Sequence, residues 1–168
     1  MSRGKALAVL CVAGVVAVAC GKAPPPQPPL PPTVTVVTPP VVKAKATMTI
    51  EAAPDVNPND LDRPSPVVVR VYQLKNDAAF RDADFAKLYA DDQTTLGQDL
   101  LRRDDYTLSP SERRSVEVEL PNESVLVCAL AAFQNINASE WRACAKLPAN
   151  AVIVAIERAR VVITTEGL

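Results

Sequence analysis

Prolines are distributed unevenly along this chain, and their positions restrict where a folded domain can lie. Nine of the 16 prolines fall within Pro24–Pro40. Proline fixes φ and lacks an amide donor, so such a run favours extended polyproline II rather than a packed element. At about 3.1 Å per residue, the 22 residues from Gly21 to Val42 span roughly 60–70 Å. We therefore expect a spacer over residues 20–42 and a folded domain over residues 43–168. A PxxP ligand for an SH3-like groove is the alternative reading of the run.

The residues before the spacer have the pattern of a secretory signal peptide over residues 1–19. Arg3 and Lys5 form a positive head, and the 14 residues Ala6–Ala19 carry no charge. This apolar run is too short to cross a bilayer core of about 30 Å, but it suits the central region of a signal peptide. The sequence therefore predicts export.

The end of this segment, Ala17-Val18-Ala19-Cys20-Gly21, resembles a bacterial lipobox. In that motif small residues precede the cleavage point, the cysteine thiol receives a diacylglyceryl group, and the freed amine is acylated, for example with palmitate. Ala17 departs from the motif, which usually has leucine there. We expect lipidation at Cys20, with ordinary secretion as the alternative. Gly21 in place of aspartate implies retention at the outer membrane, with the protein lipid-anchored and facing the periplasm.

The remaining chain is predicted to be mostly β, because short stretches of alternating or β-branched apolar residues recur between turn signals. One helical stretch is expected after Asp82 as N-cap, with Phe85, Leu88 and Tyr89 at helical spacing. An apolar stripe continues it through Leu96, Leu100 and Leu101, interrupted at Gly97. The pattern predicts a two-sheet sandwich with a helical insertion. The seven expected strands are Lys45–Ile50, Pro66–Leu74, Ser115–Leu120, Val125–Phe133, Arg142–Leu147, Ala151–Ile156 and Arg160–Thr164.

Two cysteines remain after export and lipidation, Cys128 and Cys144. In an exported protein such a pair most simply forms a disulfide. The bridge would close a loop of 16 residues and stabilise the fold by roughly 3 kcal/mol in the chain-entropy model. A redox-active pair is the alternative, but it usually needs CxxC spacing and electropositive surroundings.

Composition excludes several kinds of chemistry. The chain has no histidine, which removes His-based triads, His-ligated zinc and the commonest general base. A net charge of −1 leaves no excess of Lys and Arg for a nucleic-acid surface. Neither a GxSxG elbow nor a phosphate-binding glycine loop occurs. We expect no enzymatic activity, no cofactor, no metal and no small-molecule substrate.

Two acidic patterns have some features of a functional site. Asp55–Asn59 begins like a calcium loop, D-x-N-x-N, but Asp60 stands where the glycine belongs and Pro66 where the bidentate glutamate belongs. The doublets Asp91–Asp92 and Asp104–Asp105 could serve as a carboxylate pair for glycoside hydrolysis. Adjacent aspartates are more often helix ends or solvated turns, which is the reading we adopt.

A long polar loop over Asp55–Ser65 separates the first two expected strands. Pro54, Pro58 and Pro64 stiffen it, so it should adopt few shapes. A stiff loop on a rigid sandwich loses little entropy on binding and suits recognition. A solvated connection without function fits the residues equally well.

One stretch of the domain has a familiar order. Arg63–Lys75 (RPSPVVVRVYQLK) is followed by Phe80, by Asp84–Tyr89 (DFAKLY) and by Leu96–Leu101 (LGQDLL), and Trp141-Arg142 comes later. This run closely resembles the TssJ (SciN-like) outer-membrane lipoproteins of bacterial type VI secretion.

The resemblance implies a transthyretin-like β-sandwich with a short helical insertion and no enzymatic activity. It also implies a structural role in the secretion membrane complex, through binding of the periplasmic C-terminal domain of the inner-membrane protein TssM. In the family, the loop between the first two strands is a principal contact. Transferred to this chain, the partner-binding residues are Asn57, Asn59, Asp60, Leu61, Asp62 and Arg63.

Two features depart from what we expect of the family. Asp62 stands where many relatives have glycine, and the family is not expected to carry the Cys128/Cys144 pair or the long proline spacer. The alternative function is a periplasmic glycan- or peptidoglycan-binding lipoprotein. It would need exposed aromatic side chains, and Trp141 alone lies outside an obvious core pattern.

Overall fold

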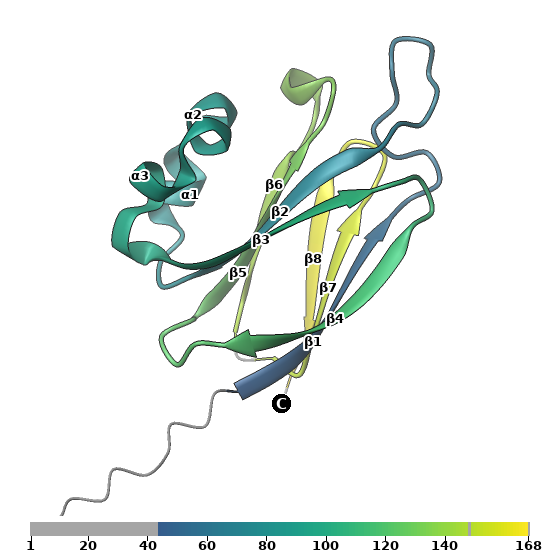
Figure 1. Ribbon diagram of the computed structural model, residues 1–168. Helices are drawn as coiled ribbons and strands as arrows, with labels where there is room; N and C mark the ends of the chain where they lie inside the picture. The colour runs from purple at the N-terminus through teal and green to yellow at the C-terminus, as the bar shows by residue number, and fades with distance from the viewer. Residues whose placement is uncertain (1–43, 148, 168) are drawn as a thin grey trace, which may run out of the picture. The chain divides into compact units, whose positions relative to one another are not determined.

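The computed structural model describes residues 44–147 and 149–167 (Figure 1). The predictions made for the signal peptide, for lipidation at Cys20 and for the proline spacer therefore lie outside the described residues.

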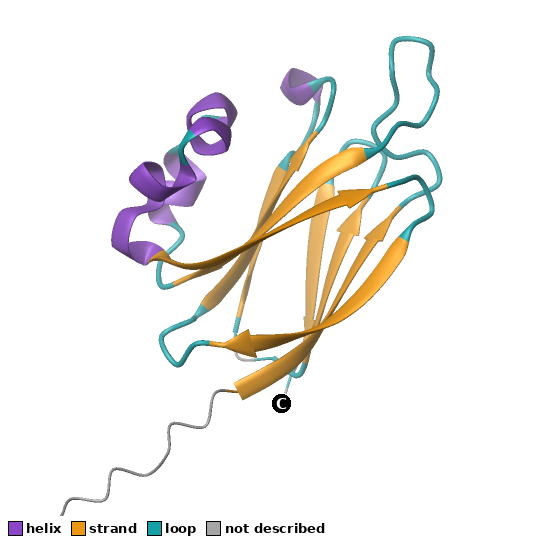
Figure 2. Ribbon diagram, in the orientation of Figure 1, coloured by secondary structure: helices purple, strands orange, loops and turns teal. Residues whose placement is uncertain are grey.

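The described chain forms two four-stranded sheets, which confirms the predicted sandwich (Figure 2). One sheet has the order β4-β1-β7-β8, in which β1 and β7 are parallel, and the other has the order β3-β2-β5-β6. All seven predicted strands are present, and an eighth, β3, was missed. The strands are β1 Ala44–Ala52, β2 Val67–Leu74, β3 Leu100–Leu108, β4 Arg113–Leu120, β5 Leu126–Ala132, β6 Arg142–Lys146, β7 Ala151–Ile156 and β8 Val161–Glu166.

The prediction that the apolar stripe stays helical through Leu100 and Leu101 is wrong, because both residues belong to β3. Gly97 has a φ of +53°, a conformation that glycine adopts without strain, and the chain turns there into the strand. β3 lies at the edge of its sheet and carries charged residues over 102–105, as edge strands often do. Because of those charges, the strand lacks the alternation of apolar and polar residues from which strands are predicted.

The helical insertion, residues 78–99, contains three short helices rather than one: α1 Ala78–Asp82, α2 Phe85–Ala90 and α3 Asp92–Leu96, followed by the 3-10 turn Gly97–Asp99. Asp82 was predicted as an N-cap but is the last residue of α1. Asp84 caps α2 by accepting a 2.8 Å hydrogen bond from the amide of Lys87, and Asp91 caps α3 through the amide of Thr94 at 3.0 Å. These carboxylates satisfy amides that the first turn of each helix leaves free.

The sheet β3-β2-β5-β6 is buried on both faces, and this creates two hydrophobic cores. One face packs against the other sheet through side chains such as Val67, Val69 and Val71 of β2. The opposite face packs against the helical insertion, and β2 contributes Tyr72 and Leu74 to it. Burial on both faces explains why β2 and β5 read as nearly continuous apolar runs.

The predicted disulfide between Cys128 and Cys144 is present. The two residues lie directly opposite each other on β5 and β6, with their Cα atoms 4.0 Å apart. Hydrogen-bonded and non-hydrogen-bonded pairs alternate along an antiparallel ladder. Because the backbone N–H of Ala131 donates to the carbonyl of Trp141, the pair three positions away, Cys128 and Cys144, is a non-hydrogen-bonded one. The bond joins the edge strand β6 to the interior of its sheet.

The loops at one end of the sandwich come from both sheets. β1 runs about 30 Å from Ala44 to Ala52, and beyond Ala52 lie residues 53–66, 109–112, 133–141 and 157–160. We call these four segments the loop end. Figure 2 shows the connection between β1 and β2, residues 53–66, projecting beyond the strands. Ala44, where the described chain begins, lies at the opposite end with residues 121–125.

Candidate partner-binding surface

The base of the β1–β2 loop (residues 53–66) is held by Asn57, which is only 3% exposed. Its backbone N–H donates to the carbonyl of Arg158 at 2.8 Å. In the side chain, Oδ1 accepts a hydrogen bond from the backbone N–H of Gln134 at 2.8 Å, and Nδ2 donates to the carbonyl of Pro66 at 2.7 Å. The φ of Asn57 is +48°, in a region that asparagine tolerates better than most residues. Asn57 thus joins the loop to the β5–β6 connection through its side chain and to the β7–β8 turn through its backbone, and its side chain also ties the two ends of the loop together.

The tip of the loop is closed by Asn59. Its Oδ1 accepts hydrogen bonds from the amides of Leu61 and Arg63, each at 3.0 Å. Its own amide donates to the carbonyl of Arg63 at 2.9 Å, and its carbonyl accepts from the amide of Asp62 at 2.8 Å. Side chains of this type stabilise tight turns by bonding to amides a few residues ahead. Residues 59–63 therefore form a compact turn that the protein's own hydrogen bonds define.

Asp62 has a φ of +59°. Aspartate is one of the few residues other than glycine that adopt this left-handed backbone readily. Its carboxylate pairs with Arg158 of the β7–β8 turn, whose guanidinium also lies 3.8 Å from the carboxylate of Asp55. The hydrogen bond with Asp62 raises the pKa of Arg158 above its ordinary value. Both partners are exposed, so the pair sets geometry more than stability.

The structure separates the six predicted contact residues into two groups. Asn57 is buried and Asn59 is half-buried, and their polar atoms bond to the loop itself and, for Asn57, also to Gln134. The other four, Asp60, Leu61, Asp62 and Arg63, are exposed at the tip. Only this second group presents side chains that a partner can reach.

Two residues that matter for the site were missed by the sequence analysis. Gln134 and Arg158 lie 77 and 96 residues from the loop positions that they contact. No local pattern marks them, because the contacts depend on how the two sheets bring the loop end together. With Asn57, Asn59 and Asp60 they line a hollow beside the β1–β2 loop.

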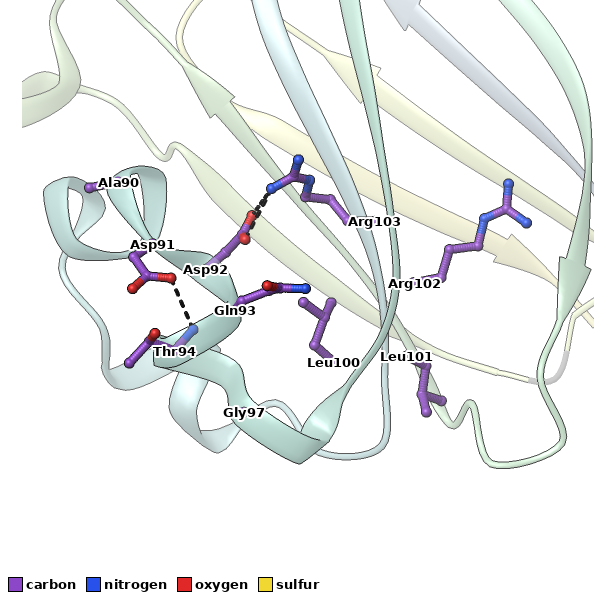
Figure 3. A pocket seen from close by; sticks show the side chains of 10 residues that line it. All are labelled: Ala90, Asp91, Asp92, Gln93, Thr94, Gly97, Leu100, Leu101, Arg102 and Arg103. Carbon is purple, nitrogen blue, oxygen red and sulfur yellow. Dashed lines mark hydrogen bonds and ion pairs between the residues drawn. The ribbon is translucent and has the colours of Figure 1, made fainter.

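The aspartate doublet at 91–92 contributes to structure. Figure 3 shows Asp91 bonded to Thr94 and Asp92 directed at Arg103. The Asp92 carboxylate is 4% exposed and accepts from Arg103 Nη1 at 2.9 and 3.0 Å. The Tyr72 hydroxyl donates to it at 3.2 Å, and Arg70 reaches both this carboxylate and the carbonyl of Tyr89. Burial and then the nearby negative charge raise the pKa of Tyr72. This network joins the helical insertion to β2 and β3.

The interpretation of both doublets as helix ends or solvated turns needs correction. It holds for Asp91, which caps α3, but Asp92 is a buried member of the network. Asp104 and Asp105 lie within β3 because an edge strand tolerates charge. Asp104 accepts from Arg102 at 2.7 Å, and Asp105 lies 3.3 Å from Arg103. These carboxylates are paired with cations of the chain itself.

Trp141 is not the isolated aromatic side chain that its sequence context indicated. Its ring is half-buried and meets the ring of Phe85 edge to face, with centroids 5.3 Å apart. The guanidinium of Arg142 lies over the same ring, 4.4 Å from its centroid, and donates to the carbonyls of Phe80 and Ala83 at 2.8 and 2.5 Å. Burial lowers the pKa of Arg142 below its ordinary value. Trp141 and Arg142 thus hold the helical insertion against β6.

Among residues 44–147 and 149–167, no three His, Cys, Asp or Glu side chains gather as a metal site would require. Within the same residues, none of the helices has both the length and the apolar character needed to cross a membrane.

One family model matches most of this chain, and solved structures of similar fold are known. The model of the family described as "Type VI secretion lipoprotein, VasD, EvfM, TssJ, VC_A0113" matches residues 44–166. The solved structure of the lipoprotein TssJ1 from Pseudomonas aeruginosa is 27% identical, with a TM-score of 0.70 over 76% of this chain and 99% of that one. A comparison with curated proteins gave no match.

Two further solved structures share the fold at lower identity. Lip from Serratia marcescens, a membrane-bound component of the type VI secretion system, is 23% identical, with a TM-score of 0.68 over 74% of this chain and 99% of that one. A chain of the structure described as the TssM C-terminal domain from EAEC is 23% identical, with a TM-score of 0.60 over 73% of this chain and 98% of that one.

Proposed function

Because this chain belongs to the type VI secretion lipoprotein family that includes TssJ, we propose that it is a structural component of the secretion membrane complex. In this proposal it is lipid-anchored in the outer membrane, faces the periplasm, and docks through the β1–β2 loop onto the periplasmic C-terminal domain of TssM. The contacts are made by Asp60, Leu61, Asp62 and Arg63, while Asn57 and Asn59 hold the loop in shape.

The observation that carries the proposal is that the β1–β2 loop projects from the sandwich and has a conformation fixed by its own hydrogen bonds. It projects at the loop end, whereas Ala44, the start of β1, lies at the opposite end of the sandwich (Figure 1). The hydrogen bonds of Asn57 and Asn59 define its shape before any partner arrives. A preformed loop loses little entropy on binding, which favours recognition over a passive connection.

The lipid anchor is part of the proposal. Acyl chains on Cys20 would hold the protein at the outer membrane, since each buried CH₂ contributes about 0.8 kcal/mol and several chains together give a durable attachment. The proline-rich spacer would then set how far the domain reaches into the periplasm. Cys20→Ser should move the protein from the outer-membrane fraction to the soluble periplasmic fraction on a sucrose gradient. Retention of this variant at the outer membrane would contradict lipidation at Cys20.

The proposed role is non-enzymatic. The family is one of structural secretion lipoproteins and not an enzyme family. Within the aspartate doublets, which were considered as a carboxylate pair, Asp91 caps α3 and the other three carboxylates pair with arginines of the chain. The glycan-binding alternative depended on Trp141 as an exposed platform, and this ring packs against Phe85 and Arg142.

Calorimetry tests the partner directly. The mature chain carrying Cys20→Ser, which stays unlipidated, would be titrated with the purified periplasmic domain of TssM from the same organism. Micromolar or tighter binding is the expected result. No binding by a chain whose circular dichroism shows a folded β-sandwich would contradict the proposed function.

A further inference from the structure

Leu61 is the most exposed large hydrophobic residue in the part of the chain that the structure describes. Its side chain is 71% exposed, and Val125 at the opposite end of the sandwich follows with 47%. A single exposed apolar side chain needs no explanation in itself. What distinguishes Leu61 is the way the backbone beneath it is held.

Hydrogen bonds fix the backbone on both sides of Leu61. Its own amide donates to Asn59 Oδ1 at 3.0 Å, and the turn is closed by the 2.9 Å bond from the amide of Asn59 to the carbonyl of Arg63. The next residue, Asp62, pairs with Arg158 of the β7–β8 turn. The chain therefore uses several polar contacts to place one apolar side chain at the tip of its longest projecting loop.

The charges around Leu61 nearly cancel. Asp60, Asp62 and Arg63 are its neighbours at the tip, and Arg158 joins them through its pair with Asp62. Asp55 lies 3.8 Å from Arg158, so three acidic and two basic side chains leave a net charge of only −1 in this cluster. Strong complementarity between unlike charged surfaces makes association fast and salt-dependent, and a rim of nearly cancelling charges contributes little to the rate or to the salt dependence. An apolar centre within a polar rim is instead the usual anatomy of a protein–protein contact.

We propose that Leu61 is the apolar anchor of the docking surface and that it inserts into an apolar pocket of a protein partner. The inference rests on the proposed function, in which that partner is the periplasmic domain of TssM. The nearly cancelling charges around Leu61 orient the contact and contribute little to its strength. A carbohydrate partner does not fit this surface, because an aliphatic side chain offers no flat aromatic face for a sugar ring.

Truncation of the two exposed hydrophobic residues provides a matched test. Leu61→Ala and Val125→Ala would be compared with the wild type in the full mature chain carrying Cys20→Ser, by calorimetry with the TssM periplasmic domain. Leu61→Ala should weaken binding about tenfold or more, since it removes most of an apolar side chain that the partner would bury. Val125→Ala should stay within about twofold of the wild type. Leu61→Met, which keeps the apolar volume, should bind more tightly than Leu61→Ala.

Salt gives an independent measurement. The wild-type dissociation constant should change by less than about threefold between low and physiological salt, because an apolar contact is not screened. Near-UV circular dichroism and thermal melting confirm that each variant is folded. Truncation of an exposed side chain should leave the melting temperature nearly unchanged.

The outcomes separate this inference from the function on which it rests. If Leu61→Ala binds as tightly as the wild type, or if binding is strongly salt-dependent, Leu61 is not the anchor, although the partner stands. If the wild type itself does not bind the TssM domain, the proposed function is overturned, and this inference with it.

Discussion

The helical insertion and the β1–β2 loop are both irregular segments fastened to the same sandwich, but they are fastened by different means. The insertion uses buried groups: Phe80 is fully buried, and Asp92 binds three side chains of the sheet behind it. The loop buries Asn57 at its base and leaves its tip in solvent. The polar residues of the insertion therefore serve stability, whereas those of the loop give a fixed shape to an exposed surface. Substitutions should separate these roles.

The largest effect on stability is expected in the insertion. Phe80 is fully buried, and its ring lies edge to face on Tyr72 with centroids 5.4 Å apart. Phe80→Ala should lower the free energy of unfolding by about 3–5 kcal/mol through lost burial and the cavity left behind, measured by urea denaturation. Binding of TssM by the folded fraction should not change. A weakening of binding as large as that of Leu61→Ala would show that the two regions are coupled.

Loss of the disulfide should have the next largest effect. The double variant Cys128→Ala/Cys144→Ala should lower the free energy of unfolding by roughly 3 kcal/mol, because the bridge restricts the unfolded chain. Reduction of the wild type should give a similar loss. The bond lies beneath the insertion and away from the loop end, so partner binding should persist at temperatures where the variant is folded. A loss below about 1 kcal/mol would contradict its role as a structural bridge.

A smaller effect on stability, joined to a loss of binding, is expected at Asn57. Asn57→Ala leaves the amide of Gln134 and the carbonyl of Pro66 without their partner, at a cost of about 1–3 kcal/mol. Asn57→Gly should cost less, since glycine adopts the φ of +48° without strain. Both variants should weaken TssM binding because the loop is no longer held. An Asn57→Ala protein as stable as the wild type would show that this contact does not hold the loop.

The smallest effect on stability is expected at Arg158. Arg158→Gln removes an exposed ion pair, so the melting temperature should hardly move, whereas TssM binding should weaken by a few-fold as the tip loosens. Arg160→Gln is the matched control, because Arg160 lies on the same turn but pairs with Glu157. Arg158→Lys, which keeps the charge, should recover part of the binding. Equal effects of the two glutamine variants would rule out a specific role for Arg158.

The strands were predictable because their signal is local. Alternation in β1 and β4, and the doubly buried runs of β2 and β5, follow directly from the side chains that each face needs. β3 was missed because it is a charged edge strand whose first leucines continue the spacing of the helix before it. The helix start was misplaced because Asp82 and Asp84 are both suitable caps, and the folded chain uses the second.

The candidate site was only half predictable, for a related reason. Prolines and turn formers indicated the β1–β2 loop, and the resemblance to the lipoprotein family gave its residues a role. How these residues are held depends on partners far along the chain, which are Gln134 for Asn57 and Arg158 for Asp62. Those contacts form only when the two sheets bring their loops together, so a local sequence pattern cannot predict them.

Replacement of the loop tip tests the central claim most directly. The amide of Asn59 and the carbonyl of Arg63 are hydrogen-bonded, so the chain ends at residues 58 and 64 are close enough for two glycines to replace residues 59–63. Calorimetry would compare this variant with the unaltered mature chain, both carrying Cys20→Ser, for binding of the TssM periplasmic domain. The account predicts a folded variant that no longer binds. A folded variant that binds as tightly as the parent chain would place the interface elsewhere on the molecule.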